Sequence, residues 1–202
     1  MGEKIRTAIE IAMEKAEKLT ALSKKEKEQI SINKKIEPIL ARFFKGDLDP
    51  ESLWKELREE KKLVLVQFQI KLVETITISL PQEELKRRKS AVLALEHLKK
   101  NPSTVNVEDL LNSLEDMSLR YLKEKEDFYS QLKSHIENNP KLLLRQIDSG
   151  GKKMAVRLSV EEAINQSQDW NDFVSEHEKR YISDFSSCLY EIKKELGLPK
   201  TE

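Results

Sequence analysis

Cysteine, glycine and long apolar runs are scarce in this sequence, and each scarcity excludes a class of protein. The one cysteine, Cys188, rules out an internal disulfide and fits a reducing compartment. Five glycines among 202 residues are too few for turn-rich β folds, dinucleotide-binding units or phosphate-cradling loops. No apolar run approaches the ~20 residues of a membrane-spanning helix, and there is no apolar signal-peptide core. We therefore expect a cytoplasmic protein that makes no membrane contact.

Charged residues are abundant instead, at 36% of the chain against ~25% in an average globular domain. Together with the many Glu, Lys, Leu and Ile residues, this composition predicts an all-α fold, arranged as an elongated multi-helix bundle. The length allows a sizeable core. We expect residues 1–202 to form a single helical domain, with short helices in a lobe at 1–101 and long helices in a lobe at 102–202.

The formal net charge is zero, but the two halves of the chain differ in sign. Residues 1–100 carry 22 Lys and Arg against 17 Asp and Glu, a net charge of +5, and residues 101–202 carry 14 against 19, a net charge of −5. A protein that binds polyanions usually has a basic excess, which this chain lacks as a whole. We interpret the halves as complementary surfaces, within one fold or across an oligomer.

The strongest pattern lies between Asn106 and Asn138, where apolar residues recur at helical spacing. It predicts one long helix with Asn106 as its N-cap and Pro140 as its stop. A second stripe at about 168–196 has comparable aromatic content, so we expect the two to pack as a long antiparallel helical hairpin with coiled-coil contacts. The stripes comprise Val107, Leu110, Leu111, Leu114, Met117, Tyr121, Phe128, Leu132 and His135 in the first, and Trp170, Phe173, Val174, His177, Tyr181, Phe185, Cys188, Ile192 and Leu196 in the second.

Earlier stretches carry weaker helix signals. Ser23 with Glu26 forms a capping-box pattern that opens a helix, and Pro38 inside it indicates either a kink or a junction of two helices. Asp49-Pro50 predicts a further helix start. Residues 63–80 alternate apolar and polar as a strand would. A single strand would lack a partner for its backbone, so helix is the preferred interpretation.

The secondary structure of residues 142–160 is open at this level. Residues 148–151, with sequence Asp-Ser-Gly-Gly, are the strongest turn signal in the chain. Residues 142–147 before it can extend helically, whereas the alternating apolar residues after it allow a short strand. A short β-hairpin near 142–160 is therefore an alternative to helix. Ser159 with Glu162 then predicts the cap of the last helical region.

The residues that carry chemistry do not form a catalytic or metal-binding set. His97, His135 and His177 fall in different predicted helices, and none belongs to a His-x-x-x-His or Glu-x-x-His pair. We interpret His135 and His177 as half-buried stripe residues, each with a hydrogen bond. Cys188 lies on an apolar stripe, where thiols are usually inert. We therefore expect no catalytic residue, no metal and no cofactor.

Two basic stretches are candidate contacts for an anion or a nucleic acid. Glu83 and Glu84 precede Arg87 and Arg88 by one helical turn and would pair with them. The other stretch, which begins at Gly150, lacks the spacing of a P-loop. A solvated helix face and a charged turn are therefore the favoured interpretations, with a backbone anion nest as the functional alternative at the turn. The candidate residues are Arg87 and Arg88 in the first stretch and Gly150, Gly151, Lys152 and Lys153 in the second.

Three parts of the chain resemble a group of uncharacterised bacterial proteins that are classed as a domain of unknown function. These parts are Thr7–Leu19, with sequence Thr-Ala-Ile-Glu-Ile-Ala-Met-Glu-Lys-Ala-Glu-Lys-Leu, the Leu80–Glu84 segment, and the two late amphipathic helices. The resemblance implies an all-α fold and carries no activity to transfer.

These patterns favour a non-enzymatic helical scaffold that acts by protein–protein contact, with a homodimer as one form of that contact. The alternative is a regulatory module that binds a ligand or nucleic acid through its basic patches, nucleic acid being the less favoured of the two. An enzyme would require carboxylates or histidines to meet in a concave pocket.

Overall fold

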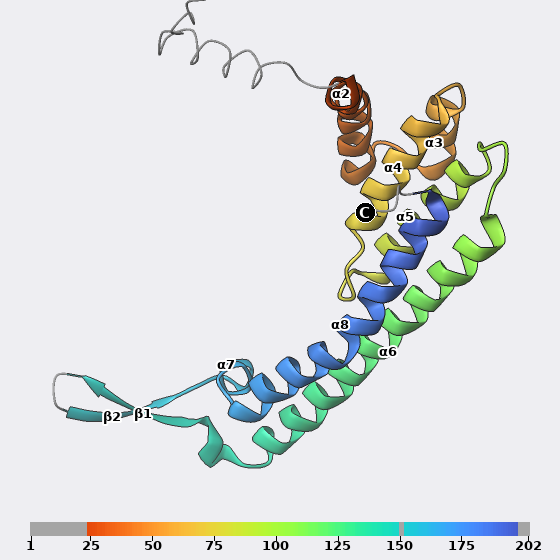
Figure 1. Ribbon diagram of the computed structural model, residues 1–202. Helices are drawn as coiled ribbons and strands as arrows, with labels where there is room; N and C mark the ends of the chain where they lie inside the picture. The colour runs from red at the N-terminus through yellow and green to blue at the C-terminus, as the bar shows by residue number, and fades with distance from the viewer. Residues whose placement is uncertain (1–23, 150–151, 198–202) are drawn as a thin grey trace, which may run out of the picture. The chain divides into compact units, whose positions relative to one another are not determined.

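The computed structural model describes residues 24–149 and 152–197 (Figure 1). The chain divides into two compact units, Met1–Leu48 and Asp49–Glu202, which we describe separately. The lobe boundary predicted at residue 101 lies inside the second unit. Ser23 of the predicted capping box lies outside the described residues.

The described part of the first unit consists mainly of helix α2 (Lys24–Lys45). It continues through Pro38 as one helix, so the junction of two helices is not observed. Gly46 ends it with a φ of 86°, a conformation that glycine adopts without steric cost. The buried side chains follow at spacings of three and four residues and therefore share one face: Ile32, Ile36, Leu40 and Phe43.

The second unit begins with three helices, α3 (Pro50–Leu57), α4 (Lys62–Glu74) and α5 (Gln82–Glu96). The predicted start of α3 is confirmed, because the Asp49 carboxylate accepts a hydrogen bond from the Ser52 backbone N–H at 2.6 Å. The ambiguous segment 63–80 is helical as preferred, up to Glu74. Eight of the 13 residues of α4 are buried, which explains why its pattern lacks the one-sided periodicity of a surface helix.

Two long helices, α6 (Thr104–Glu137) and α8 (Gln168–Leu196), run side by side through the second unit (Figure 1). They are antiparallel: the Cys188 thiol donates to the carbonyl of Leu110, and Tyr121 stacks on His177. The all-α fold with a long antiparallel helical hairpin is therefore confirmed. At 1.5 Å per residue, α6 is roughly 50 Å long.

The predicted N-cap of α6 is wrong by three residues. The helix begins at Thr104, and Ser103 is the N-cap residue. The Ser103 backbone N–H donates to the Glu96 carboxylate at 3.0 Å, so a side chain from the preceding helix fixes this end. Asn106 lies within the first turn and its side-chain amide donates to Glu195 on α8 instead.

A β-hairpin lies between the long helices. After α6 come a 3₁₀ turn, η1 (Pro140–Leu143), and two antiparallel strands, β1 (Leu144–Ser149) and β2 (Lys152–Arg157), with Leu144 opposite Arg157 and Ser149 opposite Lys152. The hairpin alternative for 142–160 is thus correct, and the helical extension of 142–147 is wrong because the chain is extended from Leu144 onward.

The last helical region consists of two helices instead of one. The predicted capping box at Ser159 and Glu162 is present and opens α7 (Val160–Asn165). Ser167 then caps α8 separately, because its side chain accepts a hydrogen bond from the Trp170 backbone N–H. Gly197 ends α8 in the left-handed conformation.

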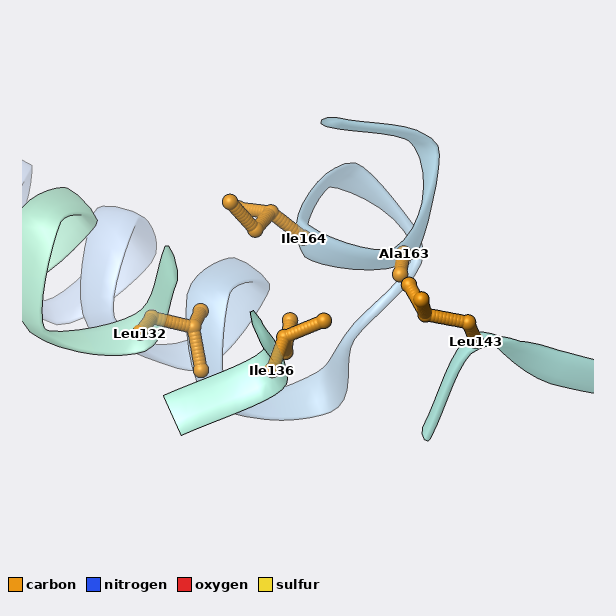
Figure 2. Packing of buried hydrophobic residues seen from close by; sticks show 5 residues of the cluster. All are labelled: Leu132, Ile136, Leu143, Ala163 and Ile164. Atoms are coloured by element: carbon orange, nitrogen blue, oxygen red, sulfur yellow. The ribbon is translucent and has the colours of Figure 1, made fainter. Parts of the chain in front are cut away.

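We call the two ends of the long helix pair the base and the tip. The base consists of α3, α4 and α5 packed against the first half of α6 and the second half of α8. The tip consists of η1, β1, β2, α7 and the adjoining ends of the long helices. A small cluster of buried side chains holds the tip together (Figure 2), formed by Leu132 and Ile136 of α6, Leu143, and Ala163 and Ile164 of α7.

Candidate functional site

The predicted basic residues Arg87 and Arg88 lie on α5 in the base and are engaged within the fold. Both pair with the Glu84 carboxylate, at 3.0 and 3.8 Å. Arg88 also donates to the carbonyl of Thr75, the residue that ends α4. Only 12% of the Arg88 side chain is exposed, and this burial lowers the pKa of its guanidinium. Arg88 therefore joins the end of α4 to α5.

The other predicted residues are distant from these two arginines. Gly150 and Gly151 lie outside the described residues, and Lys152 and Lys153 begin strand β2 at the tip. Helix α5 contacts the first half of α6, as the bond from Gln82 to Ser118 illustrates, whereas the hairpin follows the end of α6. The structure does not bring the two predicted stretches together (Figure 1).

The β-hairpin leaves several large apolar side chains exposed. Its side chains Leu144, Met154 and Val156 are 58%, 54% and 36% exposed, and Leu142 just before it is also exposed. Within the described residues the sheet has two strands, so both outer edges lack a further strand. Arg145 donates to Gln166 and thereby joins β1 to the chain between α7 and α8.

Two adjoining hollows lie beside the hairpin. The first, of about 310 Å³, has an apolar wall that includes Ile136, Leu144 and Leu158 and a rim that includes Arg145 and Asp169. The second is a shallow groove of about 570 Å³ whose wall includes Phe128 and Phe173. They meet, because both are lined by Leu132, His135 and Asp169.

Three carboxylates line the groove along α8: Asp169, Asp172 and Glu176. In the described part of the chain, none of them forms an ion pair with lysine or arginine. The groove therefore combines aromatic faces with unneutralised negative charge. His135, which also lines it, is exposed, so our interpretation of this residue as half-buried is wrong.

His177 lies between α8 and α6 and is only 1% exposed. Its ring stacks between Tyr121 and Phe173, with centroids 4.7 and 4.9 Å away. Its Nε2 lies 3.0 Å from the carbonyl oxygen of Tyr121. A carbonyl can only accept, so Nε2 carries the proton. The predicted hydrogen bond is present, while the burial is deeper than expected.

The other ring nitrogen of His177 belongs to a polar group at the helix interface. Nδ1 lies 3.4 Å from the Glu124 carboxylate and 3.5 Å from Arg180, and Glu124 also accepts a 2.8 Å hydrogen bond from the Tyr181 hydroxyl. Burial, followed by the neighbouring Glu124, raises the pKa of Tyr181. The arrangement fixes how α6 and α8 sit against each other, because each polar group has a partner on the facing helix.

Sequence reasoning missed a buried ion pair in the base. Glu96 and Lys99 are 1% and 3% exposed, and their charged atoms are 2.6 Å apart. Glu96 also accepts from Gln69 of α4 and from the Ser103 backbone, while Lys99 donates to the carbonyl of Leu196 at the end of α8. One pair thus links α4, α5, α6 and α8. Its sequence signal, an acidic and a basic residue three apart, is too common to identify it.

The described residues provide neither a cluster of metal ligands nor a membrane-spanning helix. No three His, Cys, Asp or Glu side chains there lie close enough together to hold a metal ion. None of the described helices is both long and apolar enough to cross a membrane. The Cys188 thiol is half-buried, and burial raises its pKa.

Comparison with known proteins identifies a family. No curated protein and no solved structure matches the chain. The model of a family of unknown function (DUF6657) matches residues 51–196, which include the Leu80–Glu84 segment and both long helices of the predicted resemblance. Thr7–Leu19 lies outside both the match and the described residues. Because the match covers more than half of the chain, the protein belongs to this family of unknown function.

Proposed function

We propose that the protein is a non-enzymatic helical scaffold that acts by protein–protein contact, and that the tip is its contact surface. The observation that carries the proposal is the β-hairpin, which exposes Leu144, Met154 and Val156 on a ribbon of two strands. An isolated two-stranded hairpin is marginally stable in water, and an uncovered strand edge readily pairs with another chain. A partner that covers the hairpin would stabilise it.

Charge supports a second copy of this chain as the partner. The segment 144–157 contains four basic residues and one acidic residue, whereas the neighbouring groove is lined by three carboxylates that form no ion pair within the described residues. The hairpin of one copy would lie in the groove of the other, with its apolar side chains against Phe128 and Phe173. The exchange would be reciprocal, as in a two-fold symmetric dimer.

The helix pair supplies the support that a scaffold requires. Val107, Leu114 and Tyr121 are buried at seven-residue intervals on α6, a spacing that supports an antiparallel coiled coil with α8. Satisfied polar groups such as the Tyr181 hydroxyl with the Glu124 carboxylate favour a fixed register between the helices. The tip would then be held at a defined distance from the base.

We propose no catalytic role. The polar groups at the helix interface bond to one another, and the raised pKa of the Cys188 thiol disfavours the nucleophilic thiolate. The single cysteine also supports a cytoplasmic location, because reducing compartments keep thiols free.

Sedimentation equilibrium tests the proposal at micromolar concentration. We expect the wild-type chain to dimerise, and the double variant Met154→Lys with Val156→Lys to be monomeric. Val105→Lys is the matched control, because Val105 is 71% exposed and lies at the base end of α6. It should dimerise like the wild type. A wild-type chain that stays monomeric and co-purifies with no other protein would exclude the proposal.

A charge exchange locates the contact. Asp172→Lys with Glu176→Lys in the groove, or Lys153→Glu with Arg157→Glu in the hairpin, should each abolish the homodimer. Mixing the two variants should restore a dimer, because each groove then faces a hairpin of opposite charge. If mixing restores nothing, the hairpin does not lie in the groove.

A further inference from the structure

A third hollow, of about 430 Å³, lies in the base, between the α3–α4 and α5–α6 connections. It is far from the tip and independent of the proposed contact surface. Two short segments of the chain line it: 60–62 with Leu65, and 98–101. Four of the lining residues are lysines, Lys61, Lys62, Lys99 and Lys100, and Glu60 is the one acidic residue among them. The hollow therefore has a strong excess of positive charge.

Three of these four ammonium groups are not neutralised by the fold. In the part of the chain that the structure describes, Lys61, Lys62 and Lys100 form no ion pair with a carboxylate, and all three are exposed. Lys99 differs, since its charge is compensated by Glu96 at 2.6 Å. Lysines on this surface are elsewhere commonly paired, as Lys55 is with Glu51 and Lys89 with Glu115.

The buried pair makes the wall of the hollow rigid. Lys99 is held by Glu96 and by the carbonyl of Leu196, so the segment that carries Lys100 is fixed against α5 and α8. Burial lowers the pKa of Lys99, and the charge of the nearby Lys62 lowers it further. Lys62 and Lys99 line the hollow from its two different segments, so like charges face the same space.

The backbone at the start of α4 adds to the positive electrostatic potential of the hollow. Helix α4 starts at Lys62, and its N-cap residue Lys61 gives no side-chain hydrogen bond to the first turn. The N-terminus of a helix carries partial positive charge and free N–H groups, which favour an anion. The half-buried Leu98 and the small exposed part of Leu65 line the same hollow and provide apolar surface beside the charges.

We propose that this hollow binds a small molecule that carries a phosphate group and an apolar moiety. The phosphate would contact the ammonium groups of Lys61, Lys62 and Lys100, which form no ion pair with any residue that the structure describes. The apolar moiety would lie against Leu65 and Leu98. Charge-assisted hydrogen bonds from ammonium to phosphate are the strong contacts in such a site, and three lysines that line one hollow favour a doubly charged group over a monovalent anion.

Phenyl phosphate and inorganic phosphate are suitable probes for isothermal titration calorimetry on the full chain. We expect phenyl phosphate to bind saturably at one site per chain and more tightly than inorganic phosphate, because only phenyl phosphate can cover the two leucines. The absence of saturable binding would overturn the proposal. Equal affinity for the two probes would overturn the role of Leu65 and Leu98.

Paired variants distinguish a built site from general attraction to positive charge. Lys62→Gln with Lys100→Gln should weaken phenyl phosphate binding by about tenfold or more. The control, Lys123→Gln with Lys133→Gln, removes the same charge from exposed positions on α6 and should leave the affinity unchanged. Equal losses in the two variants would exclude a specific site. All four lysines are exposed, and matching unfolding midpoints would verify that both variants fold.

Discussion

The base and the tip of the long helix pair differ in how completely their side chains are buried. In the base, α4 buries eight of its residues among neighbouring helices, and the charged pair Glu96–Lys99 has hydrogen-bond partners from three other elements, α4, the start of α6 and α8. In the tip, five buried side chains hold η1 and α7 to α6, while the adjoining hairpin leaves its apolar side chains in water. The stability of the second unit therefore resides in the base, and the contact surface that we propose lies in the tip.

The largest effect is expected from breaking the buried ion pair. Glu96→Gln leaves the Lys99 ammonium buried without a counter-charge, which we expect to cost about 3–5 kcal/mol of unfolding free energy. Chemical denaturation measures the loss. Glu83→Gln is the control, because Glu83 lies 4.0 Å from Lys86 with both side chains exposed, and this change should not alter stability measurably. Equal stability of the two variants would mean that the pair contributes nothing.

Identical leucine truncations compare the two regions directly. Leu114→Ala removes a fully buried side chain where α6 is enclosed, and Leu132→Ala removes one that is 8% exposed beside the open hollow. We expect about 3–5 kcal/mol for the first and ~2 kcal/mol for the second, because an open site leaves a smaller cavity after truncation. Urea unfolding of both variants measures the two losses of unfolding free energy. A larger loss for Leu132→Ala than for Leu114→Ala would contradict our assignment of stability to the base.

A smaller effect concerns pH, through one capping carboxylate in each region. Hydrogen bonds from Ser52 lower the pKa of Asp49 in the base, and hydrogen bonds from Ser159 lower the pKa of Glu162 in the tip. A lowered folded-state pKa gives stability that is present above the unfolded values of 3.8 and 4.5 and is lost as pH falls through the folded values. NMR titration of the carboxyl carbons should show both shifts.

A serine substitution serves as the control for this titration. Ser159→Ala removes the bond to the Glu162 carboxylate from the side-chain hydroxyl and should raise the pKa of Glu162 while leaving that of Asp49 unchanged. Acidification should also loosen the tip before the base, because the tip has fewer buried side chains to retain it. Amide exchange that accelerates first in α3 would contradict this order.

The smallest effect is expected at Cys188, midway along the second half of α8. Burial raises the pKa of its thiol, so the thiolate fraction at neutral pH is below that of a free cysteine. Reaction with an aromatic disulfide reagent should be slower in the folded chain than in denaturant. A folded rate equal to the denatured rate would place the thiol in open solvent.

The elements that depend on local signals were predictable, and those that depend on a distant partner were less so. Asp49 and Ser159 cap the helices that the sequence assigned to them, because a cap needs only its own next turn. Asn106 was a good cap in isolation, but the Glu96 carboxylate fixes the chain at Ser103 and starts α6 earlier. The alternation in 63–80 was resolved only by the absence of a partner strand.

His135 and His177 also show that burial depends on a distant partner and cannot be predicted from the local pattern alone. His135 occupies the same heptad position as Tyr121 and Phe128, but α8 begins at Gln168, and its first turn already faces Phe128 through Trp170. No helix is left to cover His135, whereas His177 lies opposite Tyr121 and is enclosed. The lysine hollow was likewise hidden, because Lys62 and Lys100 are far apart along the chain and meet only after folding.

The length of α6 has a mechanical consequence. A rod of roughly 50 Å that is clamped at one end acts as a lever, so a tilt of about 5° at the base would displace the tip by ~4 Å. The lysine hollow lies at the clamped end, beside the bond from Lys99 to the last carbonyl of α8. Any ligand that shifted this bond by a fraction of an ångström would move the hairpin by several times that distance.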